Sequence, residues 1–354
     1  MHITHLYLNG VGPLTQSHLD LQDEWRGGAH SQVLLTGPNG CGKSTLLRAI
    51  AMLWDAAGWW LDQRKHLPAK HVASVWLQRW QGVAVIFDQM EPFTTEPVGL
   101  VFGAAQWVDE LQKKHPDVQW LGESFERIER EKLTMRSLFL PEHVSWLERL
   151  TEQRRRMLLS YDKSDVPNII FLDAEERRWV SPKRNVGSPE PDLLSQRWLT
   201  RYQVSEDWKG QLENSLVGLK TTQLHKFHEV LRNLNLFLQG KEIEADIAPG
   251  ENRLSVKIKG QRGVRHSLDE LSAGEHQVLI LVYLISRWLQ PGGIVLIDEP
   301  DLYLHPSLVS GLLANLERLV ADKQGQLILT SHSVDIWQRY EQQGLRIELQ
   351  GDQA

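Results

Sequence analysis

The chain has 354 residues, of which 41% are hydrophobic and 24% are charged, and its formal net charge is −6. This composition is typical of a globular protein with a sizeable core, and it argues against a uniformly basic, histone-like nucleic-acid binder. The single cysteine excludes an internal disulfide, and no apolar stretch is long enough to cross a bilayer, so we expect a cytoplasmic protein.

The first elements are expected to be strands around a glycine-rich loop. Alternating apolar and polar residues, interrupted by Gly10, Gly12 and Pro13, predict a β-hairpin or short meander at the start of the chain. An apolar run over residues 32–36 predicts a strand that enters the loop, and residues 44–54 predict the helix that leaves it.

The middle of the chain has a mixed pattern. Its expected elements are strands at 83–87, 98–102 and 168–172, a helix at 141–156 and a loop at 182–192. An amphipathic helix follows, with apolar residues at Leu224, Phe227, Leu231, Leu234 and Leu238. Residues 253–259 alternate and predict a half-exposed strand. From residue 268 onward we expect a helix, a strand at 294–297, a helix at 307–321 and a final strand at 326–330.

The loop between the strand at 32–36 and its helix fits the P-loop pattern in full, from Gly37 to Ser44. Its glycines let successive backbone amides point at phosphate oxygens, and the helix N-terminus adds a partial positive charge. We expect Lys43 to reach the β- and γ-phosphates and Ser44 to bind Mg²⁺. The predicted nucleotide-binding residues are Gly37, Asn39, Gly40, Cys41, Gly42, Lys43, Ser44 and Thr45.

Two further sites follow the last predicted strands. The strand at 294–297 ends in Asp298 and Glu299, at the edge where ligands bind in open α/β sheets. Asp298 suits the Mg²⁺ shell, and Glu299 suits a general base acting on the attacking water. His332 comes after the next strand, in the right order to reach a γ-phosphate, although a lone histidine is more often structural.

A short segment, from Leu271 to Glu275, comes directly before a predicted hydrophobic helix. Ser272 and Gly274 at a helix start can form a second anion site. The same serine is explained equally well as an ordinary helix N-cap.

These four motifs, in this order, resemble those of ABC-class ATPase heads: Walker A at 37–44, signature at 271–275, Walker B at 294–299 and a switch histidine at 332. The stretch at 299–306, EPDLYLHP, is similar to the RecF-like, SMC-like and OLD-family branch. The resemblance is specific over about residues 1–55 and 224–340. Departures are Glu275, where many relatives carry glutamine, and the lack of an evident adenine-stacking aromatic residue.

The resemblance implies an α/β fold: a P-loop NTPase head of ABC type, with a mixed sheet flanked by helices and a large, mixed, largely helical insertion between Walker A and the signature. We expect the head at 1–60 and 260–354, and the insertion, with the Q-loop region and a partner surface, at 61–259. Gln78, Gln81 and Gln89 are all candidates for the Q-loop residue. The resemblance also implies that Ser272 and Gly274 contact the γ-phosphate bound by a second protomer, so that two chains enclose two ATP molecules with Mg²⁺.

The expected function is a dimeric ATPase that controls a nucleic-acid-directed process, such as repair or defence against phage, with a separate effector protein such as a nuclease. An ATPase subunit of a membrane transporter is the alternative. The separation of 231 positions from Lys43 to Gly274 disfavours it, since transporter heads of this class have a much shorter spacing. A self-contained OLD-type nuclease is disfavoured by the 22 residues that follow His332.

Weaker signals concern partners. Basic residues that are either solvated charge or contacts to DNA or RNA phosphates form three groups: Arg154–Arg156; Arg177, Arg178, Lys183 and Arg184; and Lys257, Lys259, Arg262, Arg265 and His266. Arg177 or Arg178 could instead serve the nucleotide site. The 14 tryptophans either pack in the core or form a partner surface. His225 and His228 share a helix face without an evident third metal ligand.

Overall fold

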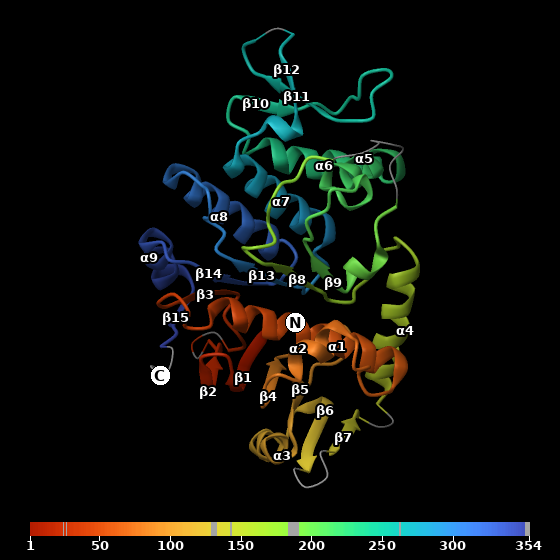
Figure 1. Ribbon diagram of the computed structural model, residues 1–354, viewed down its shortest axis with the longest axis vertical. Coiled ribbons are helices and arrows are strands. Elements are labelled where there is room, and N and C mark those ends of the chain that lie inside the picture. Colours follow the sequence, from red (N-terminus) through yellow and green to blue (C-terminus); the bar gives the residue numbers. More distant parts are fainter. Residues whose placement is uncertain are drawn as a thin grey trace.

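The computed structural model describes residues 1–23, 25, 27–128, 133–141, 144–182, 191–261 and 263–350. Two six-stranded sheets are stacked with helix α1 (Lys43–Gln63) between them, and a small third sheet lies at one end of the molecule (Figure 1).

The first sheet has the strand order β2 (Leu14–Asp20), β1 (Ile3–Val11), β4 (Gly82–Phe87), β5 (Val98–Ala104), β6 (Gln119–Ile128) and β7 (Leu133–Phe139). Its neighbouring strands are antiparallel except β5 and β6, which are parallel and connected through helix α3 (Ala105–Lys114). A parallel pair needs such a crossover, because a tight turn reverses the strand direction.

The second sheet has the order β15 (Leu345–Glu348), β3 (Gln32–Thr36), β14 (Gln326–Thr330), β13 (Ile294–Asp298), β8 (Ile169–Leu172) and β9 (Leu199–Arg201), and every pair in it is parallel. Strands β3, β14, β13 and β8 are almost wholly buried, as expected when helices cover both faces of a parallel sheet. The carboxyl ends of all six strands therefore meet at one edge.

Helices cover both faces of this second sheet. Helix α1 packs on one face, with Trp54 and Trp60 almost fully buried. Helices α7 (Ala273–Trp288) and α8 (Pro306–Ala321) cover the other face (Figure 1). Within the described ranges, no helix combines the length and apolarity that spanning a bilayer requires.

The third sheet is small and antiparallel, with the order β10 (Lys241–Ile243), β11 (Ser255–Ile258) and β12 (Arg265–Ser267). It lies beyond α6 (Leu224–Asn235) and next to the start of α7 (Figure 1). The other helices are α2 (Val72–Leu77), α4 (Ser145–Leu159), α5 (Leu212–Thr222) and α9 (Val334–Gln343).

Most expected elements are present, with shifted ends. The strand at 32–36 is confirmed, and the helix predicted at 44–54 continues to Gln63 because Trp60 and Leu61 extend its buried face. The strand at 326–330 is confirmed, but the prediction that it is the last one is wrong, since β15 follows it and pairs with β3. Residues 183–190 of the loop predicted at 182–192 lie outside the described residues.

Strand pairing ties the segment at 61–259 closely to the rest of the chain. Strands β4–β7 extend the sheet that begins with β1 and β2, and β8 and β9 extend the sheet that holds β3 and β13. The division into a head at 1–60 and 260–354 and an insertion at 61–259 stays a prediction. Each of the two six-stranded sheets nevertheless contains strands from both segments.

Candidate nucleotide-binding and catalytic site

The loop between β3 and α1 has a backbone conformation that favours glycine at three positions. Gly37, Gly40 and Gly42 have φ values of 140°, 81° and 100°, a region that other residues rarely adopt. A Cβ atom on Gly37 would lie 2.4 Å from the backbone oxygen of Leu349, so a side chain there would displace the backbone after β15. The loop therefore keeps the open backbone curl that a phosphate-binding loop needs.

Lys43 folds back over this loop. Its Nζ donates to the carbonyl oxygens of Gly37 and Pro38, both at 3.0 Å, and the side chain is largely buried. Asn39, Gly40 and Ser44 are exposed on the outer side of the loop, and Thr45 is half-buried. The predicted binding residues from Gly37 to Thr45 thus form one continuous segment, and the Lys43 ammonium group is held against its first two residues.

Cys41 is 3% exposed, and its Sγ lies 3.8 Å from Lys43 Nζ. The thiol therefore packs under the loop, and it is reached from solvent only when the loop opens.

The predicted Walker B residues lie at the end of β13. Asp298 is buried and accepts a hydrogen bond of 2.5 Å from the Thr330 hydroxyl on the neighbouring strand β14. Glu299 has a positive φ of 47°, and its N–H donates to the same hydroxyl at 3.0 Å. This left-handed turn directs the two consecutive residues differently, so one carboxylate is buried and the other is partly exposed.

The structure brings Glu299 and His332 together. The Glu299 Oε1 lies 3.5 Å from His332 Nε2, and both side chains are about one third exposed. Strands β3, β14 and β13 are adjacent and parallel, so the P-loop, His332 and the acidic pair follow neighbouring strand ends. An acid, a histidine and a phosphate loop thus share one sheet edge, where proton transfer next to a bound phosphate is chemically feasible.

Two buried charged residues at the same edge complete the site. Asp173 directly follows β8, is 4% exposed and forms an ion pair with Arg48 of α1. Arg177 is fully buried, and its guanidinium donates a hydrogen bond to the backbone oxygen of Glu299. The sequence contains a signal for Asp173, since an apolar strand followed by an acid occurs there just as it does at 294–298.

The predicted signature residues begin helix α7. Ser272 is its N-cap and forms a capping box with Glu275: the Ser272 hydroxyl accepts from the Glu275 N–H at 3.3 Å, and the Ser272 N–H donates to Glu275 Oε2 at 2.7 Å. The N-cap interpretation is therefore confirmed, while a contact from Ser272 and Gly274 to a second protomer's nucleotide stays a prediction. A Cβ on Gly274 would lie 3.0 Å from the backbone oxygen of Tyr303, so the signature packs beside the segment after Walker B.

Glu275, which departs from the glutamine of many relatives, has a structural role. Its Oε2 also accepts from Lys241 Nζ at 2.9 Å. Burial raises the pKa of Glu275, but the bonds from Lys241 and Ser272 outweigh that effect and hold the pKa below its usual value. The carboxylate thus links the signature to strand β10.

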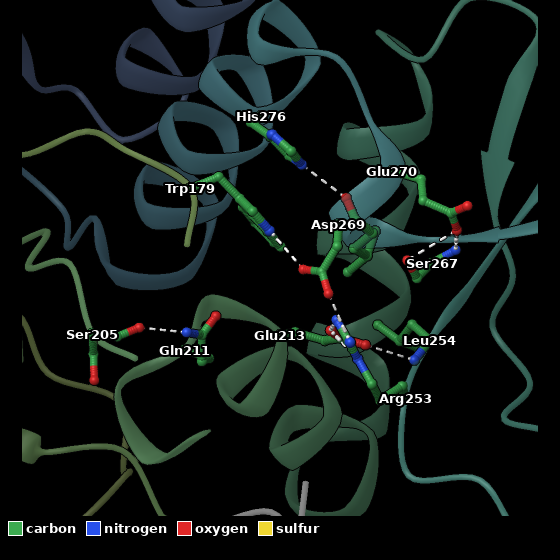
Figure 2. Close-up of polar contacts among 11 residues, drawn as sticks. Trp179, Ser205, Gln211, Glu213, Arg253, Leu254, Ser267, Asp269, Glu270 and His276 are labelled. Atoms are coloured by element: carbon green, nitrogen blue, oxygen red, sulfur yellow. Dashed lines mark hydrogen bonds and ion pairs between the residues drawn. The ribbon is translucent and has the colours of Figure 1, made fainter. Parts of the chain in front are cut away.

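A polar network behind the signature joins α7, α5 and the third sheet (Figure 2). The His276 ring stacks on Trp179 at 4.5 Å, and its Nε2 lies 2.8 Å from the backbone oxygen of Leu268. Asp269 accepts from Trp179 Nε1 and from Arg253, each at 2.8 Å. The guanidinium of Arg253 also donates twice to Glu213 of α5, which is almost fully buried. These bonds hold Asp269, which lies two residues before the signature, against Trp179 and Arg253.

The three Q-loop candidates lie in different places. Gln81 precedes β4 and packs against Gly10 of the β1–β2 hairpin, whose tip at Gly12 faces Thr45 of the P-loop region. Gln89 follows the opposite end of β4, and Gln78 ends helix α2. Gln81 is therefore linked to the P-loop region indirectly, through the β1–β2 hairpin.

Several predicted partner residues are structural instead. Arg154 is 6% exposed, forms an ion pair with Asp62 and lies over the Trp198 ring at 4.5 Å. It cannot contact nucleic acid from that position, because its charge is already paired inside the fold. Arg156 is exposed and pairs with Glu152 on the same helix.

The remaining basic residues divide between exposed and paired positions. Lys257 and Lys259 are exposed, and Arg265 pairs with Glu244 at 2.7 Å. Lys183, Arg184 and Arg262 lie outside the described residues. Across the described part of the chain, His225 and His228 belong to no group of three or more side chains arranged to hold a metal.

Half of the tryptophans, seven of the 14, are buried in the core. Thirteen of the 14 are buried or half-buried, and Trp25 is the one that is largely exposed. Trp54 and Trp198 show why: their rings stack at 4.1 Å, and each indole N–H donates to the other's backbone oxygen.

The phosphate loop, the acid pair and the histidine at one edge of a parallel sheet define a P-loop ATPase. The chain belongs to the family described as "AAA domain, putative AbiEii toxin, Type IV TA system", which matches residues 114–336. A second AAA domain family matches residues 1–55, the part that contains the P-loop.

One curated relative is the "Retron Ec83 probable ATPase" of Escherichia coli, which is 26% identical over 378 residues. The alignment covers 89% of this chain and 66% of that protein, so the chain spans slightly less than two thirds of the relative's length. Among solved structures, the SMC head domain from Thermotoga maritima is similar with a TM-score of 0.44 and 15% identity, over 98% of this chain and 94% of that one. An SmcHead bound to the C-winged helix domain of ScpA gives a TM-score of 0.45 and 14% identity, over 94% and 91% of the two chains.

Proposed function

We propose that this protein binds ATP with Mg²⁺ and hydrolyses it between two protomers arranged head to tail. The observation that carries the proposal is the placement of Glu299 and His332, 3.5 Å apart, at the sheet edge that also holds the P-loop. A partly exposed carboxylate beside a phosphate loop is placed to accept a proton from an attacking water.

The residues present fit a magnesium-bound triphosphate. Asp298 offers a buried carboxylate that accepts from the Thr330 hydroxyl, and Ser44 offers an exposed hydroxyl at the first turn of α1. These two residues would hold Mg²⁺, and the ion would supply charge neutralisation of the phosphate oxygens. Lys43 would exchange its two loop carbonyls for phosphate oxygens. Glu299 would take the proton of the water, and His332 would contact the γ-phosphate.

The signature is proposed to act on the nucleotide of the other protomer. Ser272 and Gly274 lie at the N-terminus of a 16-residue helix, whose dipole favours an anion. Ser272 and Glu275 already satisfy each other, so a phosphate would compete with the capping box for the serine hydroxyl. Gln81 is the proposed Q-loop residue, because it packs against the hairpin whose tip faces Thr45.

The biological role proposed is control of a nucleic-acid-directed defence process through a separate effector protein such as a nuclease. The similarity to a retron ATPase supports this role over that of a transporter subunit. Lys257 and Lys259, exposed on and after strand β11, are the proposed contacts to DNA or RNA phosphates.

Mixing two inactive variants tests the head-to-tail arrangement. Lys43→Ala should lose nucleotide binding, and Ser272→Arg should bind ATP but fail to form the closed dimer. A heterodimer of the two has one intact P-loop facing one intact signature, so hydrolysis should return at one composite site. If heterodimers form and hydrolysis does not return, Ser272 does not act on the partner's nucleotide.

A further inference from the structure

Arg177 connects three functional elements from inside the fold. Its side chain is fully buried, and each part of the guanidinium has a different acceptor. Nη2 donates to the backbone oxygen of Glu299 at 2.7 Å, Nη1 to that of Leu172 at 3.2 Å, and Nε to the Gln277 side chain at 3.1 Å. A buried arginine is rarely retained unless its hydrogen bonds are all made, and here they join Walker B, strand β8 and helix α7.

The bond with Gln277 is reciprocal. Gln277 Nε2 donates to the backbone oxygen of Arg177 at 2.5 Å, while its Oε1 accepts from the guanidinium. Gln277 lies one turn after Ser272 on α7 and is 3% exposed. Since a helix moves as a rigid unit over so short a distance, a shift of Gln277 displaces Ser272 as well.

The contact to Glu299 acts at an equally sensitive point. The Glu299 backbone has a left-handed φ of 47°, which orients its side chain toward His332. A donor held on the Glu299 carbonyl therefore fixes the peptide plane from which the carboxylate projects. Burial lowers the pKa of Arg177 to about 10, with Asp298 and Asp173 among the carboxylates that oppose the shift, so the group stays charged near neutral pH.

We propose that Arg177 and Gln277 form a coupling unit that sets the general base of one ATP site and the signature of the other site together. This inference rests on the proposed head-to-tail dimer, in which each chain supplies Glu299 to its own nucleotide and Ser272 to its partner's. Within each chain, the Arg177 guanidinium then contacts both the Glu299 carbonyl and Gln277 of helix α7, which begins after Ser272. Closure at one site is thereby transmitted to the geometry of the other, and Arg177 and Gln277 act as positioning residues.

The test uses the active heterodimer of Lys43→Ala and Ser272→Arg chains, with Gln277→Leu placed in one chain at a time. In the Lys43→Ala chain, the substitution affects the signature of the single active site. In the Ser272→Arg chain, it affects the Glu299 of that site. Disrupting a coupling network of this kind changes the linked equilibrium by about 3- to 30-fold. We expect kcat to fall by that factor in both placements, with the KM for ATP nearly unchanged because the P-loop is untouched.

Controls separate positioning from loss of folded protein. Ser286→Ala lies on the same helix and is similarly buried, but its hydroxyl contacts Asn233 rather than Arg177, so it should leave kcat unchanged in either chain. The stoichiometry of ATP binding reports the folded fraction. If Gln277→Leu prevents folding, Gln277→Glu keeps the acceptor and removes the donor. Arg177→Lys should reproduce the two-placement effect.

Each result bears on the coupling. A fall in kcat in one placement only means that Arg177 serves one site alone, and unchanged kcat in both means that the contacts are not used in turnover; both results overturn the proposal. The reference is the mixture of Lys43→Ala and Ser272→Arg chains without a substitution at Gln277. If its heterodimers form and recover no hydrolysis, the head-to-tail dimer itself is refuted, and the coupling then fails for that separate reason.

Discussion

Replacing Glu299 with glutamine should lower the rate of ATP turnover without changing the stability of the fold. The substitution preserves the size of the side chain and the left-handed backbone. The contact that it changes, with His332 at 3.5 Å, joins two side chains that are 34% and 39% exposed. Exposed ion pairs contribute about 0.2–1 kcal/mol, so the free energy of unfolding should change by no more than that.

The effect on turnover should be far larger. An amide cannot accept the proton of the attacking water, and removal of a general base commonly slows a reaction by about 10²–10⁴-fold. At 1.36 kcal/mol for each factor of ten, this corresponds to roughly 2.7–5.4 kcal/mol of lost transition-state stabilisation. The loss in activity should thus exceed any loss in stability several-fold.

Turnover, stability and nucleotide binding can be measured on one preparation, by steady-state phosphate release, thermal melting and binding of a fluorescent ATP analogue. We expect Glu299→Gln to melt like the wild type, to bind ATP and to accumulate as a closed dimer. Glu152→Gln is a suitable control, since Glu152 is exposed and pairs with Arg156 on the same helix, α4. Turnover above about a tenth of the wild-type rate would show that Glu299 is not the base.

Four other outcomes are expected. Arg154→Ala should lower the free energy of unfolding by about 2–3 kcal/mol, less than for a fully buried pair because Asp62 is 25% exposed, whereas Arg156→Ala should stay within about 0.5 kcal/mol; equal denaturation midpoints would contradict the buried role. Burial lowers the pKa of His276, so its stabilising contribution is complete above its unfolded value of 6.5 and is lost as the pH falls below it; His276→Gln should therefore melt with a weaker pH dependence between pH 7.5 and 5.5, and an unchanged slope would exclude this group. Lys257→Glu should weaken nucleic-acid binding and reduce the salt slope by about 1, without changing ATP turnover, and an unaltered slope would identify it as solvated surface. Alkylation of Cys41 should be slow and inactivating, and Mg-ATP should slow it further; identical labelling with and without nucleotide would show that the thiol is remote from the phosphates.

Contiguous motifs are the part of this protein that can be predicted from its sequence. The P-loop is one continuous segment, and its glycines permit the positive-φ curl that a phosphate-binding loop needs, so Gly37 to Ser44 identify both the structure and its ligand class. The acid pair at Asp298 and Glu299 is recognisable for the same reason, because it directly follows a short continuous apolar run that predicts a buried strand. Capping by Ser272 is equally local, since the hydroxyl bonds a backbone amide three residues away.

Tertiary structure alone decided which charged residues are available to a partner. Arg154 and Arg156 are neighbours in the sequence, yet the first is buried against Trp198 and the second is exposed, because α4 presents only one side to the core. The tryptophans were ambiguous in the same way, since an aromatic residue suits a core and a partner surface equally well.

Long-range pairing explains the rest. Strand β15 carries no signal that places it beside β3, from which it is separated by some 300 residues. Arg177 and Gln277 are 100 residues apart, and their reciprocal bond exists only because the segment that follows β8 packs against helix α7. Local residue patterns determine backbone conformation and ligand chemistry. The buried contacts between distant segments depend on how the sheets and helices pack together, and here that packing joins the backbone of Glu299 to helix α7 through Arg177.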